Sequence, residues 1–271
     1  MRVLTWNLWW QYGPWQQRQP ALVEELLAVD ADLVLLQEVW AAGGADQVDE
    51  LASAAGLASV RTVAPGGKPH KFGNAVLSRW PIERLEQVEL PGVAGEPSYR
   101  NALACRVAAP VGPVLAVVTH LAWQYDQSQL RCRQLAEVVA LIARHRSDNP
   151  AHPPVILGGD LNAVPDSDEV RRLTGLSQPY APGLVFTDCW AAAGDGPGFT
   201  WSRDNPHAAD ALWPRRRIDY VFVSWPRAKP LGNPVAAEVI GRQARRGVVP
   251  SDHYGVLVEL DDRSTGDEGP R

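Results

Sequence analysis

The sequence feature that most constrains the fold is a series of apolar, strand-like runs that each end on a polar side chain. The run VILGGDLN (155–162) shows the pattern, because its apolar residues lead directly to Asp160 and Asn162. The other polar residues at such points are Asn7, Glu38, His120, Asp219, Asp252 and His253. A buried polar group without a partner is costly, and ligands in open α/β sheets collect where strand ends converge. The recurrence therefore predicts that these residues share one site.

Strand-like and helical runs alternate along the chain, which predicts an α/β fold. The strand-like run 3–8 is followed by an amphipathic helix with Leu22, Leu26 and Val29 on one face, and then by the strand-like run 33–39. A second β-α-β unit has a helix that opens at Ser128 and leads into the run ending at Asp160.

The remaining strand-like runs have period-two or continuous apolar patterns and are separated by glycine- and proline-rich connections. They are SVRTV (59–63), NAVLS (74–78), NALACRVA (101–108), VLAVVTH (114–120), FTWS (199–202), RIDYVFVS (217–224) and YGVLVEL (254–260). No internal linker divides these runs, so the sequence predicts one domain over residues 1–260. The polar residues 261–271 are predicted to be a disordered tail.

Composition excludes several classes of protein. Three widely spaced cysteines, Cys105, Cys132 and Cys189, argue against a disulfide framework and a zinc site of the C-x-x-C type. The net charge of -5 provides no global attraction to nucleic acid or anionic membrane. The strand pattern begins at Met1 and no apolar run reaches 18 residues, so we expect neither a signal peptide nor a transmembrane segment and predict a cytoplasmic protein with no evident obligate protein partner.

The polar strand-end residues have the chemistry of a metal-dependent phosphate site. Glu38 and Asp252 are hard oxygen donors and Asn7 adds an amide oxygen, a set that suits Mg²⁺, with Mn²⁺ as a substitute. Asp160 and Asn162 are two residues apart, so an extended chain points both toward the same face, where they can orient and deprotonate a water.

Histidines complete this predicted site. His120 and His253 can donate hydrogen bonds to charge that develops on phosphoryl oxygens, and Asp219 can hold an imidazole in the useful tautomer. No step of such a reaction needs a covalent intermediate.

The motifs TWN, LLQE, GNAVLSRWPI, THL, GDLN, FTWS, RIDYVFVS and SDH occur in the order found in the endonuclease/exonuclease/phosphatase superfamily, the metal-dependent phosphoesterases related to DNase I. The resemblance extends from about residue 3 to residue 260. It implies a four-layer α/β sandwich of two stacked mixed β-sheets flanked by helices, with Mg²⁺ at the strand ends. By position it implies metal-side roles for Asn7, Glu38 and Asp252, water activation by Asp160, and phosphate contacts by Asn162, His120 and His253. Asp219 resembles the family residue that orients a histidine.

Differences from individual subfamilies leave the substrate open. Trp9 stands where apurinic-site endonucleases and tyrosyl-DNA phosphodiesterases carry an acid, which disfavours DNA repair. The segments LLQEVW and NLWW are similar to the corresponding segments of neutral sphingomyelinases. The DCW…FTWS…N pattern from Asp188 to Asn205 is similar to the tyrosyl-DNA phosphodiesterases.

Arginines and aromatic residues near the motifs are candidate substrate contacts. Arginine clusters precede Asp219 and Asp252 and are suited to a second substrate phosphate, although such clusters are commonly solvated surface. From these clusters, from the helix after THL and from the tryptophans near the strand ends, we select Arg131, Arg217, Trp123 and Trp201. Four histidines are predicted to be surface residues: His70, His145, His152 and His207.

The sequence hypothesis is a Mg²⁺-dependent hydrolase, either a phosphodiesterase or a phosphatase, in which an Asp160-activated water attacks phosphorus in line. Its substrate is expected to be a nucleotide, a nucleic acid or a phospholipid head group. Alternatives within the enzyme class are a sphingomyelinase-like or phosphoinositide hydrolase, and a DNA or RNA nuclease or tyrosyl-DNA phosphodiesterase-like enzyme. The alternative from another class is a non-catalytic binding protein with the same fold.

Overall fold

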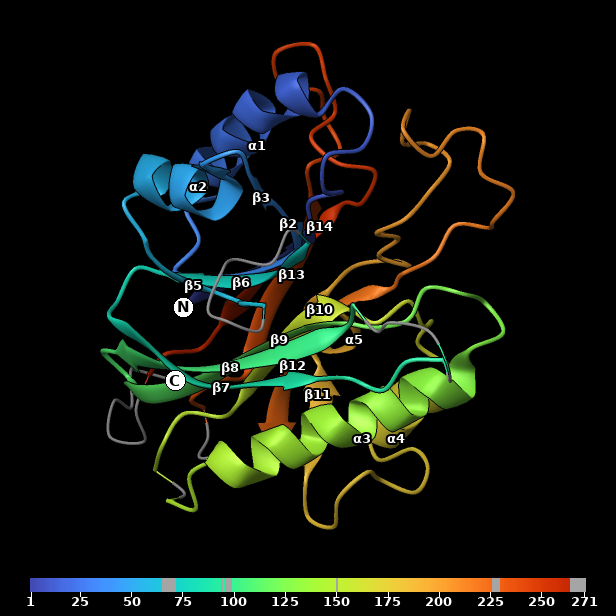
Figure 1. Ribbon diagram of the computed structural model, residues 1–271. Helices are drawn as coiled ribbons and strands as arrows, with labels where there is room; N and C mark the ends of the chain where they lie inside the picture. The colour runs from blue at the N-terminus through green and yellow to red at the C-terminus, as the bar shows by residue number, and fades with distance from the viewer. Residues whose placement is uncertain (65–71, 94, 96–98, 150, 226–229, 264–271) are drawn as a thin grey trace.

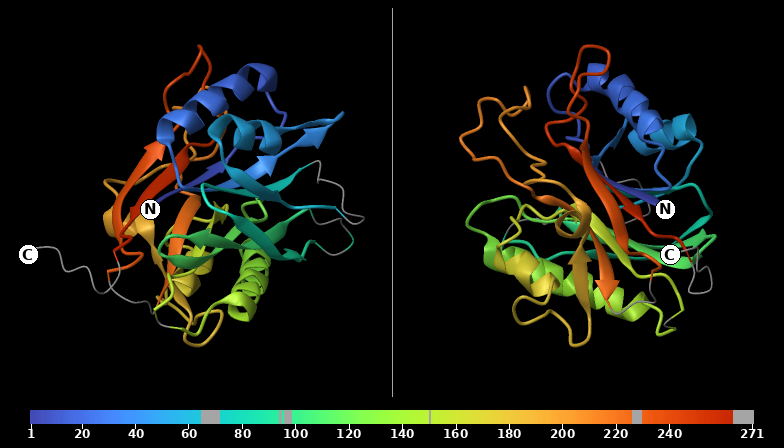
Figure 2. Two further views of the ribbon diagram at one scale, coloured as in Figure 1. Left: turned by 90° about the vertical axis from the view of Figure 1, so that its left-hand side faces the viewer. Right: turned by 180° about the vertical axis from the view of Figure 1, so that it is seen from behind.

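The computed structural model describes residues 1–64, 72–93, 95, 99–149, 151–225 and 230–263. Two six-stranded sheets are stacked face to face, and helices cover the outer face of each sheet (Figure 1). Views from the side and from behind show the same layers (Figure 2). The predicted four-layer α/β sandwich is therefore confirmed.

Each sheet combines strands from distant parts of the chain. The first sheet has the order β13 (Pro234–Ile240), β14 (Gly255–Leu260), β1 (Arg2–Asn7), β2 (Leu33–Val39), β6 (Gly73–Ser78) and β5 (Ala58–Arg61). The second has the order β11 (Val185–Asp188), β12 (Asp219–Trp225), β10 (Ile156–Asp160), β9 (Gly112–His120), β8 (Asn101–Ala109) and β7 (Ile82–Glu89). A small hairpin joins β3 (Ala41–Ala42) to β4 (Ala45–Asp46).

The helices cover the two sheets separately. Figure 1 shows α1 (Trp15–Val29) and α2 (Gln47–Ala55) over the first sheet. The helices α3 (Ser128–His145) and α4 (Asp168–Leu173) lie over the second sheet, while the short α5 (Cys189–Ala193) lies beside β12 and β13.

Three buried clusters fill the spaces between the four layers, and the alternation along β2 shows how the sequence supplies them. Leu33 and Leu35 point into the cluster between the two sheets, whereas Val34 and Leu36 point into the cluster beneath α1 and α2. A strand buried on both faces in this way reads as a continuous apolar run. A third cluster lies between the second sheet and α3 and α4.

Most predicted elements are present, including the helix that opens at Ser128, but several were missed and one was wrong. The sequence did not predict α2, the edge strand β7, or β13, and it took the stretch that holds α4, β11 and α5 as irregular. Half-buried β7 has little apolar alternation to reveal it. FTWS is not a strand, since its only β contact is an isolated bridge from Trp201 to Arg216.

Parallel pairing brings the polar strand ends to one edge of the sandwich. β1 is parallel to β2, and β9 is parallel to β10. Asp160 at the end of β10 pairs with His120 on one side and Asp219 on the other. Gly159 permits this pairing, because a Cβ there would overlap the Thr119 carbonyl oxygen.

Within the described residues, no helix combines the length and the apolar character needed to cross a membrane. Most of the tail predicted to be disordered, and His70, fall outside the described residues. All three cysteines are free thiols, with Cys105 and Cys189 buried.

Candidate active site

The predicted polar residues meet where the two sheets converge. A cavity of about 300 Å³ is lined by six of them: Glu38, His120, Asp160, Asn162, Asp252 and His253. Asn7 and Asp219 are buried and hydrogen-bonded to members of this group. The first sheet and the loop before β14 supply Asn7, Glu38, Asp252 and His253, and the second sheet supplies His120, Asp160 and Asp219.

Glu38 enters the cavity from an irregular point of β2. The register with β6 shifts between Leu36 and Val39, and Glu38 itself has a left-handed backbone with φ of 55°. Its Oε2 atom is buried and has no hydrogen-bond partner. Burial, followed by the charge of Asp252, raises the pKa of Glu38 to about 7, and burial also raises the pKa of Asp252. Two close, destabilised carboxylates with an unsatisfied oxygen are suited to holding a cation.

Asn7 connects this acidic pair to Asp160. Its Nδ2 donates to Glu38 Oε1 at 3.2 Å and to Asp160 Oδ2 at 3.0 Å. Its Oδ1 accepts the Trp9 backbone N–H at 2.9 Å. The amide oxygen predicted for the metal therefore has a backbone partner, and the amide nitrogen of Asn7 links two carboxylates through hydrogen bonds.

Asp160 is a buried carboxylate whose surroundings partly offset the cost of its charge. Burial and then the charge of Asp219 raise its pKa to about 6, against the lowering effects of His253, the Asn7 amide and the Asn162 backbone. Asn162 has a left-handed φ of 50°, and its N–H donates to Asp160 Oδ1 at 2.9 Å. A carboxylate titrating near neutrality has the proton affinity expected of a general base.

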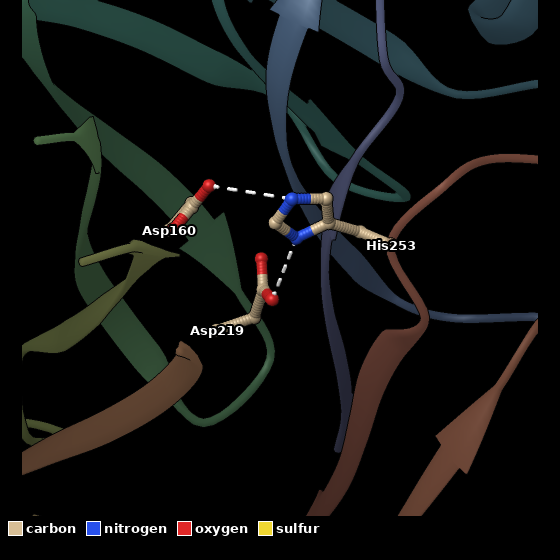
Figure 3. A group of neighbouring side chains, drawn as sticks. All are labelled: Asp160, Asp219 and His253. Carbon is tan, nitrogen blue, oxygen red and sulfur yellow. Dashed lines mark hydrogen bonds and ion pairs between the residues drawn. The ribbon is translucent and has the colours of Figure 1, made fainter. Parts of the chain in front are cut away.

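His253 lies between two aspartates (Figure 3). Its Nδ1 is 2.9 Å from Asp219 Oδ2, and its Nε2 is 3.8 Å from Asp160 Oδ2. Burial opposes a charge on the ring, but Asp219, Asp160 and Asp252 outweigh it and hold the pKa of His253 well above 6.5. Asp160, Asp219 and His253 could also be taken as a metal-binding group. His253 Nδ1 is already engaged by Asp219, whereas Glu38 Oε2 has no hydrogen-bond partner, so we take Glu38 and Asp252 as the candidate metal-binding acids.

His120, unlike His253, is uncharged. Burial, Arg100 and His253 hold its pKa well below 6.5, so the ring is neutral. The guanidinium Nη1 of Arg100 is 2.7 Å from His120 Nδ1. Because a guanidinium only donates, Nδ1 accepts and the ring proton lies on Nε2. That Nε2 is 3.4 Å from Asp160 Oδ2.

Residues of the recognised motifs also hold the loops of the site together. The Ser251 hydroxyl donates to the Asn7 carbonyl at 2.7 Å, and Asn205 Nδ2 donates to the Ser251 carbonyl at 2.8 Å. The Thr200 hydroxyl accepts the backbone N–H groups of Ile218 and Asp219. FTWS therefore acts as a loop that supports Asp219, not as a strand.

Arg18 is a buried arginine that the sequence analysis did not single out. Its guanidinium donates at 2.9 Å to five backbone carbonyls: Leu8, Trp9, Trp10, Tyr12 and Pro250. These carbonyls belong to the loops that flank Asn7 and Asp252. The available signal was its position four residues before Leu22, on the apolar stripe of α1.

Two predicted substrate contacts do not line the cavity. Arg131 is buried against Glu169 at 2.7 Å, and Arg217 is buried against Asp188 at 2.8 Å. Both guanidinium groups are used inside the fold, so we no longer assign them to substrate. In the second arginine cluster, Arg245 and Arg246 pair with glutamates of α1.

The aromatic lining is larger than the sequence indicated. Trp123 and Trp201 line the cavity as predicted. The other aromatic and arginine side chains of the lining are Trp9, Tyr12, Phe72, Tyr125, Trp213, Arg100 and Arg216. His207, taken for a surface residue, is half-buried behind Trp9 with the ring centroids 4.8 Å apart.

A larger cavity of about 630 Å³ lies at the opposite end of β9 and β10. Its lining includes Leu115, His145, Val155 and Trp225 but none of the clustered strand-end residues. The converging carboxylates and imidazoles, not cavity size, identify the candidate active site.

The model of the Endonuclease/Exonuclease/phosphatase family matches residues 4–253. This chain belongs to that family. Protein angel of Drosophila melanogaster is 27% identical over 177 residues, which cover 61% of this chain and 48% of that protein. The uncharacterized protein YbhP of Escherichia coli (strain K12) is 31% identical over 182 residues, which cover 59% of this chain and 66% of YbhP. The matched region thus covers about half of Protein angel and about two thirds of YbhP.

Solved structures share the fold over nearly the whole chain. TDP2 of D. rerio, complexed with a single strand DNA product, has a TM-score of 0.73 at 23% identity, covering 95% of this chain and 97% of that one. An endonuclease/exonuclease/phosphatase from Beutenbergia cavernae has a TM-score of 0.65 at 26% identity, covering 95% and 70%. These likenesses support the family's phosphoesterase fold for this chain.

Proposed function

We propose that this protein is a divalent-metal-dependent phosphoesterase that hydrolyses a phosphate ester by direct in-line attack of a water activated by Asp160. The observation that carries the proposal is that the buried Asp160 carboxylate lies between two imidazoles that differ in protonation, neutral His120 and protonated His253. This arrangement provides a base and two different hydrogen-bond donors in the same cavity.

Glu38 and Asp252 would hold the metal. The fit rests on the unpartnered Glu38 Oε2 and on the raised pKa values of both acids, since a bound cation would offset the cost of burying their negative charges. Hard carboxylate oxygens favour Mg²⁺ or Mn²⁺. When bound, such an ion supplies positive charge that polarises the phosphoryl group.

The protein residues perform the proton transfer and the positioning. Asp160 accepts a proton from the attacking water while the new P–O bond forms and the P–O bond to the leaving group breaks. Asn7 and the Asn162 backbone hold the Asp160 carboxylate in place. His253, oriented by Asp219, and the Nε2–H of His120 donate to the phosphoryl oxygens as negative charge develops there.

The test compares an aryl phosphodiester with the matching monoester, using purified protein with Mg²⁺, Mn²⁺ or a chelator. We expect turnover only with metal, and Asp160→Asn should reduce kcat by about a hundredfold or more, because general-base catalysis contributes at least this much. Metal binding and the thermal unfolding curve of the variant serve as controls for its fold. Undiminished turnover by Asp160→Asn, or no turnover of either ester by metal-bound wild type, would contradict the proposal.

A further inference from the structure

One wall of the active-site cavity is a stack of planar groups that the phosphate chemistry does not use. The rings of Tyr125 and Trp213 are stacked with centroids 4.1 Å apart and an interplanar angle of 17°. The guanidinium of Arg216 lies 4.4 Å from the Tyr125 ring and 5.6 Å from the Trp201 ring. One face of a ring accommodates one planar group at this spacing, so Trp201, Arg216, Tyr125 and Trp213 form a continuous row.

The row leads from the reacting centre to solvent. Arg216 is close enough to Asp160 and Asp219 for their charges to affect its pKa, although burial is the larger effect and lowers it. Its Nε is buried without a hydrogen-bond partner. At the other end, Trp213 is 41% exposed, and the neighbouring lining residue Trp123 is 56% exposed.

Two separate loops build this row. Tyr125 lies between β9 and α3, whereas Trp213 and Arg216 belong to the 201–217 segment that projects from the sandwich (Figure 1). Exposed tryptophan faces beside a phosphate site are costly to leave open to water and are suited to stacking on a planar ligand. An aliphatic chain would gain no geometric benefit from such a ladder.

We infer that the substrate carries a planar aromatic ring on the non-leaving side of its scissile phosphate, and that this ring extends the stack at Trp213. Arg216, which lines the cavity, can then donate a hydrogen bond to a non-bridging phosphate oxygen while its face stays on Tyr125. This inference rests on the proposed phosphoesterase function and specifies its substrate class. A nucleobase and a simple aryl group share the required chemistry.

The test uses three diesters with one leaving group, the p-nitrophenyl esters of thymidine 5′-phosphate, phenyl phosphate and methyl phosphate. Because the leaving group is common, the ratio of kcat/KM values within one protein reports on the second substituent. We expect the wild type to prefer a ring-bearing ester over the methyl ester by about tenfold or more, a size typical of base stacking on an aromatic side chain. Preference for thymidine alone identifies a nucleoside, and equal preference for phenyl identifies a general aryl ring.

Variants separate the stack from other causes of preference. Trp213→Leu should bring the ratio close to one, while Trp213→Phe, which keeps a ring, should retain most of it. Trp225→Leu is the matched control, because Trp225 is 54% exposed and lies at the far cavity. A wild-type ratio near one, or a full ratio in Trp213→Leu, would overturn the inference.

A binding measurement keeps this outcome distinct from failure of the proposed function. If no ester is hydrolysed by metal-bound protein, calorimetric titration with thymidine 5′-monophosphate and with methyl phosphate still tests the stack. Tighter binding of the nucleotide to wild type than to Trp213→Leu supports it, and equal binding refutes it.

Discussion

Glu38 combines a left-handed backbone with a carboxylate that lacks a partner for one oxygen. Strained or poorly satisfied residues persist where the surrounding fold enforces them, commonly at functional sites. Among the described residues, six non-glycine positions have positive φ. Four of them, Trp9, Trp10, Glu38 and Asn162, lie in or next to this site, and the other two are Asp30 and Arg246. The metal-free protein therefore bears a stability cost at the residue that we expect to hold the metal.

The pH dependence of stability tests this cost. The folded pKa of Glu38, about 7, lies above its reference value of 4.5, so its contribution is fully present below pH 4.5 and is lost as pH rises through 7. The loss is about 3 kcal/mol, at 1.36 kcal/mol per unit. With chelator present, the free energy of unfolding of Glu38→Gln, minus that of wild type, should increase by this amount between pH 4.5 and 8 in urea titrations. At pH 8, Mg²⁺ should stabilise wild type more than the variant. A difference that does not change with pH would contradict the assignment.

Arg100 should act as a positioning residue for His120. Arg100→Met removes the donor to Nδ1, so the ring should populate the other tautomer, and kcat should fall about 10- to 100-fold, as for loss of a partner that orients a functional histidine. Nitrogen chemical shifts of His120 report the tautomer directly. Arg100→Lys, which restores a donor, should recover part of both signals. An unchanged tautomer in Arg100→Met would disprove this role.

The sequence identified the residues whose polarity interrupts an apolar run, because a site at strand ends leaves that local mark. Asp160 and His120 are examples. It could not identify Arg100, because its importance depends on a histidine 20 residues away. It also gave no sign that Arg131 and Arg217 form ion pairs inside the fold, because the sequence does not show that Glu169 and Asp188 lie opposite them.

At the scale of elements, helix α1 is tied to the active-site loops by one side chain. Arg18 is 1% exposed, and the carbonyls that its guanidinium contacts come from the loop after β1 and from Pro250. The helix thus contributes its apolar stripe to the core and also fixes the backbone on both sides of the acidic pair. Amphipathic periodicity predicted the helix, but its anchoring role requires knowledge of the loops that it meets.

Substitution of Arg18 should therefore cost both stability and activity. Arg18→Met leaves five backbone carbonyls without this donor, those of Leu8 and Pro250 in buried bonds, and we expect a loss of about 3 kcal/mol or more in the free energy of unfolding, together with weaker metal binding. Arg79→Met is the control, since Arg79 is 42% exposed and its ion pairs with Asp30 and Asp32 should be worth less than about 1 kcal/mol. Denaturant unfolding and metal titration measure the two effects. Equal losses in both variants would show that Arg18 has no special role.

For the molecule as a whole, the active site is an interface between two sheets. Glu38 and Asp252 lie on the side of the first sheet, and Asp160 lies on the second. Hydrogen bonds from Asn7 to Asp160 and between His253 and Asp219 connect the two sides at the site. Under the proposed mechanism we therefore expect the separation of the sheets to affect catalysis. It is set in part at Gly158, where a Cβ would come within 2.5 Å of Leu35 Cδ1 and 3.4 Å of Thr5 Cβ.

A double-mutant cycle across this interface tests whether sheet spacing controls the site. Gly158→Ala should reduce stability by about 1–3 kcal/mol through overpacking and should also lower kcat, because Asp160 is two residues away on the same strand. Leu35→Ala alone should cost about 2–5 kcal/mol by leaving a cavity.

The double variant should lose at least about 1 kcal/mol less free energy of unfolding than the sum of the two single losses. The reason is that the methyl group introduced by Gly158→Ala would occupy space that the Leu35 side chain leaves. Leu36→Ala provides the control cycle, because Leu36 faces the α1 and α2 side and should combine additively with Gly158→Ala. If both kcat and stability recover in the double variant of the Leu35 cycle, but not in that of the Leu36 cycle, the distance between the sheets determines the position of Asp160 relative to Glu38 and Asp252. If both cycles are additive, the close approach at Gly158 does not constrain the site.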